Sequence, residues 1–326
     1  MATATLLLPG RDRFGGQPLP EPLARALGRA DRSTNAEPGE RAQLLRHFAL
    51  LPRGWPVAAL TRQLDAGDAA ASQWLRADPA WVRPEINGAR LLACGEGLHL
   101  TQQDVDALLP ALRPLFGDAG FPIDAPLPSR WYLRMPQGAT LPRFVEPGDA
   151  LGADVFDSMV GTEAAADAGS RRWRALLNEA QVVLHNHPWN ARRAAAGKPP
   201  VNSLWFWGAG KAPDHVASAH ARVHSDDAML QALAMATGLP SSRRAPRFAV
   251  PDTDALLDLR DLRDPALLFD DWLLPALEAV RRDGLQRLRL DFADGHGYML
   301  ARAQRWRLWR RPLRELAAAQ ARRPAA

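Results

Sequence analysis

The chain has 326 residues, of which 47% are hydrophobic and 24% charged, as is typical of a globular protein with a sizeable core. No apolar run is long enough for a membrane-spanning helix, and the start has no basic leader, so neither a membrane segment nor a signal peptide is expected. The net charge of +5 permits an acidic ligand or partner without requiring nucleic acid. A single cysteine, Cys94, excludes an internal disulfide and favours a cytoplasmic protein. Its position after an apolar run favours a structural thiol.

The first hundred residues contain signals for strands and helices in alternation. Residues 5–12, TLLLPGRD, are predicted as a strand that ends in a turn, and residues 17–31 as a proline-broken segment that becomes helical. Apolar residues at helical spacing predict a helix over 40–50. Residues 71–95 are predicted to be β structure, because the Asn-Gly of INGAR lies between two short apolar runs.

The remaining elements continue this alternation. Thr101 and Asp104 open a predicted capped helix over 100–117. Residues 122–152 are predicted as loops around one strand at 130–135, and helices are predicted at 170–185 and 224–238. The last of these has Ser225 or Asp226 as its N-cap and Gly238 as its stop. From 270 onward, helix and strand alternate and lead to an arginine-rich predicted helix over 306–323, so the fold class is predicted to be α/β.

Histidines and acids between 220 and 227 can be interpreted in two ways. The pair His220 and His224, followed by Asp226 and Asp227, has the residue types of a metal site. The same residues also suit a polar loop that leads into a helix cap. Spacing alone does not distinguish the two interpretations.

Two further stretches have alternative interpretations. The segment GAGK at 208–211 lacks the spacing of a nucleotide-binding loop, which favours a strand that runs into a glycine turn. The C-terminal segment 302–323 interleaves arginines with Trp306 and Trp309, which could stack on bases. It equally suits an amphipathic surface helix, and because no nucleic-acid-binding signature accompanies it, a nucleic-acid partner is not expected.

A longer stretch carries a family resemblance. Residues 187–210, HPWNARRAAAGKPPVNSLWFWGAG, resemble the H-P-x-N-x-x-R-x-x-x-G-x-x-P-A-N-x-x-(W/L)-x-(W/R)-G-x-G signature of archaeal-type cofactor-independent phosphoglycerate mutases. That family belongs to the alkaline phosphatase superfamily. The segments 8–27 and 223–240 are similar to the family's opening and to its helix after the tryptophan-rich strand. The layout also resembles that of RpfE-type regulatory proteins. The signature positions are occupied by His187, Asn190, Arg193, Gly197, Asn202, Gly208 and Gly210.

The resemblance implies a two-domain architecture. An alkaline-phosphatase-like core sheet, flanked by helices, is expected from residues 1–75 and 187–326. A smaller α/β domain, inserted over 76–186, is expected to correspond to the family's substrate domain. Gly208 and Gly210 are expected to form the turn at the end of the tryptophan-rich strand.

The departures from the family pattern concern its metal site. The family's first strand ends in a metal-binding Asp, and Pro9 stands at that place here. Residues 241–326 hold a single histidine, His296, where the family has several His ligands. The family's P-P-H-D motif is EPGD at 146–149. These losses imply that the two-metal site for Mn, Zn or Mg is gone, and no cofactor is expected.

Three functions remain open. The first is a mutase-like protein without phosphoryl transfer that acts in regulation, through a protein partner or a small phosphorylated or carboxylate ligand. The ligand would bind between the domains at Arg76, His187, Asn190, Arg193 and Asn202, although the same residues can equally be scaffold. The second is an active mutase or phosphatase with displaced ligands such as Asp12, His224, Asp226 and Asp227. The third is a nucleic-acid-associated regulator that uses the Arg/Trp-rich tail. Whether the chain is an enzyme stays open.

Overall fold

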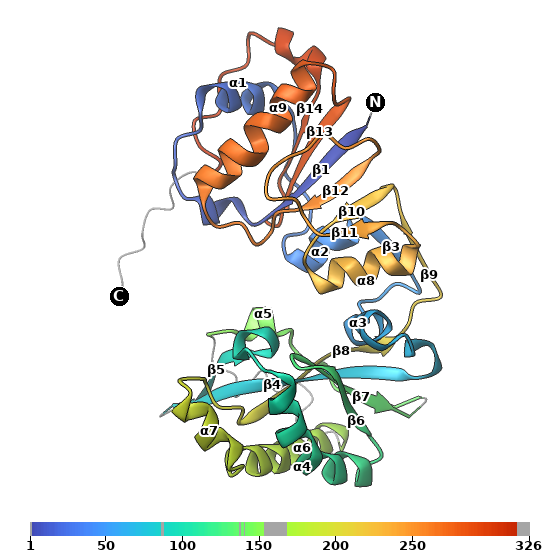
Figure 1. Cartoon of the computed structure of the whole chain (residues 1–326). Coiled ribbons are helices and arrows are strands. Elements are labelled where there is room, and N and C mark those ends of the chain that lie inside the picture. The colour runs from blue at the N-terminus through green and yellow to red at the C-terminus, as the bar shows by residue number, and fades with distance from the viewer. Residues whose placement is uncertain (1, 86–87, 137, 140, 153–167, 318–326) are drawn as a thin grey trace. The chain divides into compact units, whose positions relative to one another are not determined.

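The computed structural model describes residues 2–85, 88–136, 138–139, 141–152 and 168–317. The chain forms two compact units: Met1–Arg53 with Asp214–Ala326, and Gly54–Pro213 (Figure 1). Each unit contains strands and helices, which confirms the predicted α/β class. No helix in the described part of the chain is both long and apolar enough to span a membrane.

The first unit is built on a seven-stranded sheet of order β11-β10-β12-β1-β13-β14-β2. The run from β11 to β13 is parallel, whereas β14 pairs antiparallel with both β13 and β2. In register, Leu7 of β1 lies beside Asp258 of β12 and Asp291 of β13. The strands are β1 (Thr3–Leu8), β2 (Asp31–Ser33), β10 (Arg222–His224), β11 (Ser241–Ser242), β12 (Ala255–Asp258), β13 (Arg287–Phe292) and β14 (Gly297–Leu300).

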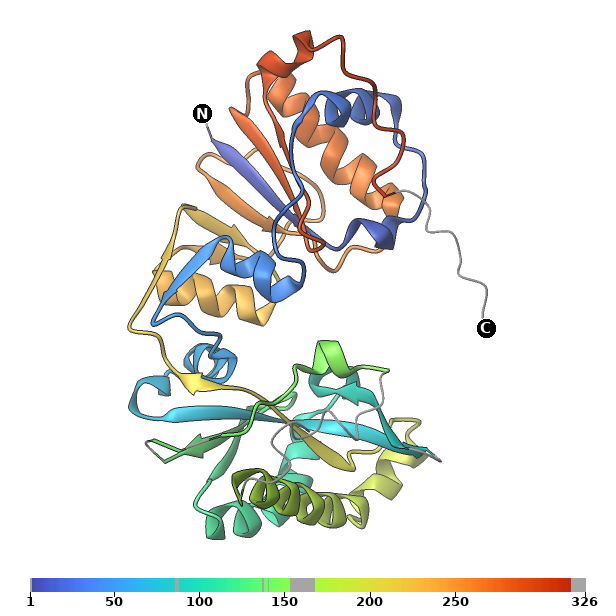
Figure 2. The same cartoon turned by 180° about the vertical axis from the view of Figure 1, so that it is seen from behind.

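One face of this sheet is covered by α1 (Glu21–Arg29), the π-helical turn η5 (Leu267–Leu273) and α9 (Leu274–Arg281) (Figures 1 and 2). Alternate strand residues such as Ala4, Leu6 and Leu8 enter this core, because successive side chains of a strand point to opposite faces. The short helix η1 (Arg11–Phe14) adds Phe14.

A smaller antiparallel pair completes the first unit. Strand β3 (Phe48–Leu51) pairs with β9 (His215–Ser218), and α2 (Glu40–Leu45) and α8 (Ala228–Thr237) lie against them. The helix predicted over 40–50 therefore ends at Leu45, and the chain turns into β3, whose backbone groups pair with β9. The N-cap of α8 is Asp227 rather than Ser225 or Asp226, while Gly238 ends the helix with φ 72°, as predicted.

The second unit contains a five-stranded sheet around the long strand β4 (Gln73–Glu85). Four strands pair antiparallel along this sheet: β5 (Gly88–Cys94), β6 (Ile123–Leu127), β7 (Arg130–Met135) and β8 (Ser203–Lys211). The predicted β structure over 71–95 is confirmed, and the Asn-Gly turn itself lies partly outside the described residues. Strand β6 was not predicted, because Pro126 interrupts its apolar pattern.

Helices α4 (Gln102–Asp118) and α6 (Ala168–His185) pack on one face of this sheet, in a core that includes Phe206. The predicted cap of α4 is present: the Asp104 carboxylate accepts hydrogen bonds from the backbone N–H and the hydroxyl of Thr101, at 2.7 and 2.8 Å. Trp205 and Trp207 of β8 belong to the cluster on the opposite face. The other helices among the described residues of this unit are α3 (Val57–Ala66), η2 (Ala69–Ala71), η3 (Gly95–Leu98), α5 (Pro147–Ala150) and α7 (Trp189–Ala195).

The boundaries of the two units differ from those predicted. A division at residues 76 and 186 would cut β4 after its first three residues and would separate it from β8. The two strands pair from Gln73 with Lys211 to Ala80 with Ser203, and this ladder keeps residues 54–213 together.

Gly208 and Gly210 lie inside β8 rather than in a turn beyond it. The pairing shifts register between Trp74 and Arg76, and Gly208 has φ 65° at this bulge. A Cβ atom at Gly208 would lie 2.8 Å from the Cβ of Val57, and one at Gly210 would lie 2.5 Å from that of Pro56. These glycines therefore let α3 approach the strand closely.

The arginine-rich C-terminal segment is not the predicted helix in its described part. A short 3-10 turn, η6 (Arg302–Trp306), is followed by irregular chain to residue 317, and residues 318–323 lie outside the described residues. Arg307 and Arg310 donate hydrogen bonds to the carbonyls of Arg29 and Ala30, at 3.1 and 2.9 Å. These contacts hold the segment against the end of α1, and Pro312 removes a helical donor.

Candidate functional site at the carboxyl edge of the sheet

The carboxyl ends of β10, β12 and β1 lie at one edge of the parallel part of the first sheet. Open α/β sheets bind their ligands at this edge, because the loops that follow the strands converge there. Strand β12 ends in Asp258, and β10 is followed directly by Ser225 and, two residues on, by Asp227. A cavity of about 290 Å³ opens beside these residues.

Asp258 and Arg260 form a bidentate ion pair in the wall of this cavity. Arg260 Nε lies 2.8 Å from Asp258 Oδ1, and Arg260 Nη2 lies 2.8 Å from Oδ2. The two residues expose only 5% and 8% of their surfaces. Parallel contacts of this kind between guanidinium and carboxylate are among the strongest hydrogen bonds in proteins.

Both groups stay charged because each compensates for the burial of the other. Burial by itself raises the pKa of Asp258, but the hydrogen bonds from Arg260 and Ser225 outweigh that effect and the pKa lies below its usual range. Burial lowers the pKa of Arg260, and the contact with Asp258 reverses this and raises it above the usual value.

Two further side chains join the pair. Ser225, fully buried, donates its hydroxyl proton to Asp258 Oδ2 at 2.7 Å and accepts the backbone N–H of Asp227 at 2.9 Å. Asp227 Oδ1 lies 3.0 Å from Arg260 Nη2 and caps α8 through the N–H of Leu230. Ser225 therefore connects Asp258 to the backbone of Asp227. Because Arg260 keeps Asp258 ionised with a lowered pKa, Asp258 is a weak base for activating this serine as a nucleophile.

The whole cavity is acidic rather than basic. Five carboxylates and three arginines line it, which leaves two negative charges in excess. Arg244 pairs with Asp261 and donates to the carbonyl of Asp258 at 2.7 Å, so it is not free either. An anion such as a phosphate is disfavoured here by charge.

The residues considered as displaced metal ligands do not converge. His220 contacts His47, His224 Nδ1 lies 2.9 Å from Ser242 Oγ, and Asp227 holds Arg260. Asp226 lies 4.0 Å from Arg243, and Asp12 lies in η1 after β1, where Pro9 follows the strand. Among the residues that the structure describes, no group of three or more His, Cys, Asp or Glu side chains is placed to hold a metal ion.

In the second unit, Arg76 is buried in an ion pair of its own. Its guanidinium lies 2.9 and 2.8 Å from the two carboxylate oxygens of Asp78, which is two residues along the same strand and thus on the same face. Trp207 Nε1 donates to Asp78 at 2.7 Å. Burial raises the pKa of Asp78 despite these contacts. Arg76 is therefore already neutralised within the core.

Arg193 and Asn190 hold the crossover that leads to β8. Arg193 lies 2.8 Å from Asp104 and donates to the carbonyls of Pro199 and Leu98, at 2.9 and 2.8 Å. Burial raises the pKa of Asp104, but hydrogen bonds from Trp189, Thr101 and Arg193 lower it to about 2. Asn190 makes a two-way contact with the backbone of Val201, at 2.9 Å in each direction.

Asn202 and His187 also contact backbone. Asn202 bonds both the N–H and the carbonyl of Val82, at 2.9 and 2.7 Å, and so continues the ladder between β8 and β4. His187 Nδ1 accepts the N–H of Trp189 at 3.2 Å at the start of α7. These contacts with the backbone agree with the scaffold interpretation of these residues, and whether they also bind a ligand stays a prediction.

A second polar cluster lies in the first unit. His47 Nε2 lies 2.8 Å from Asp291 Oδ2, and His47 Nδ1 lies 3.0 Å from His220 Nε2. Because a carboxylate only accepts, His47 donates to Asp291 and, when neutral, accepts from His220. Arg46 pairs with both Asp291 oxygens, at 2.6 and 3.2 Å. Burial and the neighbouring His47 lower the pKa of His220 to about 4.

This shift predicts acid sensitivity. Because His220 has a pKa of about 4 when folded against 6.5 otherwise, the unfolded chain takes up its proton first as the pH falls. We expect the free energy of unfolding to drop by about 2 kcal/mol from this group between pH 6.5 and pH 4. Arg289 and Asp254 also face the ring and partly offset each other.

The measurement is urea unfolding of wild type and His220→Gln across this pH range. Gln can still donate to His47 Nδ1 but does not titrate, so its pH dependence should be shallower. Equal pH dependence of the two proteins would contradict the assignment to His220.

Sequence reasoning missed Ser225, Asp258 and Arg260. A signal was present, because Asp258 and Arg260 are two residues apart at the end of the apolar run ALLDL, as Arg76 and Asp78 are within theirs. Residues at this spacing on a strand share a face and can pair. No sequence spacing indicates the cluster of His47, His220 and Asp291, because these residues come from three distant segments of the chain.

The chain is similar in sequence to several known proteins. No protein-family model matches the chain. A probable 2,3-bisphosphoglycerate-independent phosphoglycerate mutase of Geobacter sulfurreducens is 26% identical over 201 residues, which cover 61% of this chain and 47% of that protein. The corresponding mutase of Methanosarcina barkeri is 50% identical over 38 residues, 12% of this chain and 10% of that protein.

The chain is thus similar in sequence to cofactor-independent phosphoglycerate mutases. It matches about half the length of the Geobacter relative. Two solved structures are also similar: a cofactor-independent phosphoglycerate mutase of Thermoplasma acidophilum (TM-score 0.43, 15% identity, 92% of this chain and 90% of that one) and a protein of Pyrococcus horikoshii (TM-score 0.45, 14% identity, 91% and 87%).

Proposed function

We propose that this protein is a phosphoglycerate-mutase-like, alkaline-phosphatase-type protein that has lost two-metal phosphoryl transfer and acts in regulation by sensing a small anionic ligand. The observation that carries the proposed loss of two-metal phosphoryl transfer is the buried guanidinium of Arg260. It lies among the carboxylates at the carboxyl edge of the sheet, 2.8 Å from Asp258 and 3.0 Å from Asp227.

The donor set at this edge does not fit two divalent metal ions. Two-metal phosphoryl transfer needs several carboxylate or imidazole ligands with open positions on each metal. Here the best-placed carboxylate, Asp258, is used on both oxygens by Arg260, and the side chain of Pro9, after β1, has no ligand atom. A guanidinium supplies one fixed positive charge but has no coordination position and cannot act as a Lewis acid.

We infer the regulatory role from the features that the chain keeps. The family-like strand and crossover are kept, and Arg260 and Arg244 at the carboxyl edge are paired with neighbouring carboxylates. A protein of this kind would bind a ligand or a partner without turnover, and its layout resembles that of RpfE-type regulatory proteins.

The experiment compares metal content and turnover. We expect the purified protein to retain no stoichiometric Mn, Zn or Mg by mass spectrometry, and to convert no 3-phosphoglycerate in an enolase-coupled assay with or without added MnCl₂. An active cofactor-independent phosphoglycerate mutase serves as the positive control. Stoichiometric metal together with metal-dependent turnover would overturn the proposal in favour of an active mutase with displaced ligands.

One observation favours the nucleic-acid alternative. Trp306 and Trp309 expose 67% and 77% of their surfaces beside several arginines. Salt-dependent binding of single-stranded DNA that Trp306→Ala/Trp309→Ala weakens would support it. Binding that this variant leaves unchanged would exclude stacking by these two side chains.

A further inference from the structure

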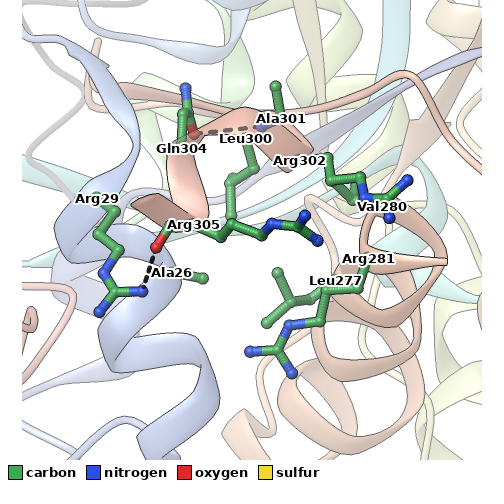
Figure 3. Close-up of a pocket in the computed structure, with 10 residues that line it drawn as sticks. All are labelled: Ala26, Arg29, Leu277, Val280, Arg281, Leu300, Ala301, Arg302, Gln304 and Arg305. Atoms are coloured by element: carbon green, nitrogen blue, oxygen red, sulfur yellow. Dashed lines mark hydrogen bonds between the residues drawn. The ribbon is translucent and has the colours of Figure 1, made fainter. Parts of the chain in front are cut away.

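A pocket lies at the amino end of the parallel strands, away from the carboxyl edge. Leu300, at the end of β14, pairs with Leu288 near the start of β13, which places this end of the sheet beside η6. The pocket is bounded by α1, α9 and η6, all in the first unit (Figure 3).

Its lining combines an apolar floor with a basic rim. The floor consists of Ala26, Leu277, Val280 and Leu300. Four arginines surround it, and Figure 3 shows that they come from α1, α9 and η6. They are Arg29, Arg281, Arg302 and Arg305.

The positive charge of the rim is only partly compensated. Arg302 forms an ion pair with Asp283, and Arg281 lies 3.9 Å from Glu278. Arg29 donates to the carbonyl of Arg305, an uncharged partner, at 2.9 Å. Within the described part of the chain, Arg305 has no carboxylate partner and lies over the ring of Trp306 at 4.9 Å. Because Arg282 binds Glu278 more closely, at 2.7 Å, Arg29, Arg281 and Arg305 have no close carboxylate partner among the described residues.

The backbone around the pocket is fixed in advance. Gln304 accepts the N–H of Ala301 at 3.2 Å and donates to Asp31 and the carbonyl of Met299, each at 3.0 Å. Arg307 reaches Asp31 and the carbonyl of Arg29. A ligand would therefore order only the arginine side chains, which limits the entropy lost on binding.

We propose that this pocket binds a small organic anion: a carboxylate or phosphate head carried on a compact apolar body. The head would contact Arg281 and Arg305, and the body would cover Leu277 and Val280. This inference rests on the proposed ligand-sensing function and gives it a site, because Arg76 and Arg193 are neutralised within their own core.

The size and charge of the pocket fit this class of ligand. Its volume of about 70 Å³ exceeds several times the 10–15 Å³ or so that one water needs, so it can take a head group with a few carbons. Arginine binds carboxylate and phosphate through paired hydrogen bonds. The acidic cavity at the carboxyl edge would repel the same ligand.

The test is isothermal titration calorimetry of the full chain with phenyl phosphate, benzoate, inorganic phosphate and benzyl alcohol. We expect phenyl phosphate or benzoate to bind more tightly than inorganic phosphate, and benzyl alcohol not to bind. The site is supported whether phenyl phosphate or benzoate binds more tightly. The tighter of the two shows whether the pocket prefers a phosphate or a carboxylate head. Equal affinity for inorganic phosphate, or binding of benzyl alcohol, would overturn it.

The variant Arg281→Gln/Arg305→Gln should weaken binding by about tenfold or more, because charge-assisted hydrogen bonds are lost. Its unliganded melting temperature should match the wild type, since neither side chain has a close carboxylate partner. The control Arg113→Gln/Arg243→Gln removes the same charge elsewhere on the surface and should bind normally. Equal affinity in both double variants would overturn the proposal. Mutase turnover would overturn the proposed function and leave this site standing.

Discussion

Replacing Arg260 by leucine is expected to lower the free energy of unfolding by about 3–5 kcal/mol, because it leaves the buried carboxylate of Asp258 without its cation. The effect is a consequence of burial: Asp258 must then either keep an uncompensated charge or take up a proton. Far-UV circular dichroism during urea unfolding measures the loss.

Two variants test the cause. Arg260→Leu/Asp258→Asn should recover part of the loss, because the amide needs no counter-charge and its oxygen still accepts from Ser225. Arg243→Leu is the matched control, since its side chain is 92% exposed and lies 4.0 Å from Asp226. We expect it to change the stability by less than about 0.5 kcal/mol. A small loss in Arg260→Leu, equal to that of Arg243→Leu, would contradict the buried-pair account.

Arg76→Leu is expected to cost a similar amount, about 3–5 kcal/mol, in the second unit. Asp78 is 2% exposed, so the loss of its partner leaves a charge inside the core. Tryptophan fluorescence reports this unit, since Trp131, Trp205 and Trp207 lie close to the pair or to its strand.

The variant Arg76→Leu also distinguishes a structural role of Arg76 from a role in ligand binding. If Arg76 were a ligand anchor, its loss would weaken binding and leave unfolding unchanged. Arg76→Leu/Asp78→Asn should regain stability, because the amide oxygen can still accept from Trp207. Arg113→Gln, on the exposed side of α4, is the control. Unchanged unfolding of Arg76→Leu would show that the pair contributes little.

Local patterns predicted most elements correctly. The apolar run before Pro9, the Thr101 cap and the Gly238 stop each describe interactions within a few residues, and the structure confirms them. The helix predicted over 306–323 failed in its described part because contacts from Arg307 and Arg310 to the distant end of α1 replaced helical hydrogen bonds. The extension of the second helix beyond Leu45 failed for a similar reason, the pairing of β3 with β9.

The candidate site was less predictable, because function depends on which charges remain unpaired. Arg193 resembles a free ligand-binding arginine in sequence, but its partner Asp104 is 89 residues away. His47 and Asp291 meet across 244 residues. The arginines around the amino-end pocket come from α1, α9 and η6, and no spacing in the chain relates them.

By itself, the sequence determined the α/β class and the similarity to cofactor-independent phosphoglycerate mutases. These depend on periodicity and on residue identity along the chain. Only the tertiary structure decided that Arg76, Arg193 and Arg260 are buried with carboxylates while Arg305 is not. The reason is that the energy of a charge depends on its burial and its nearest partner, and both are set when distant segments pack together.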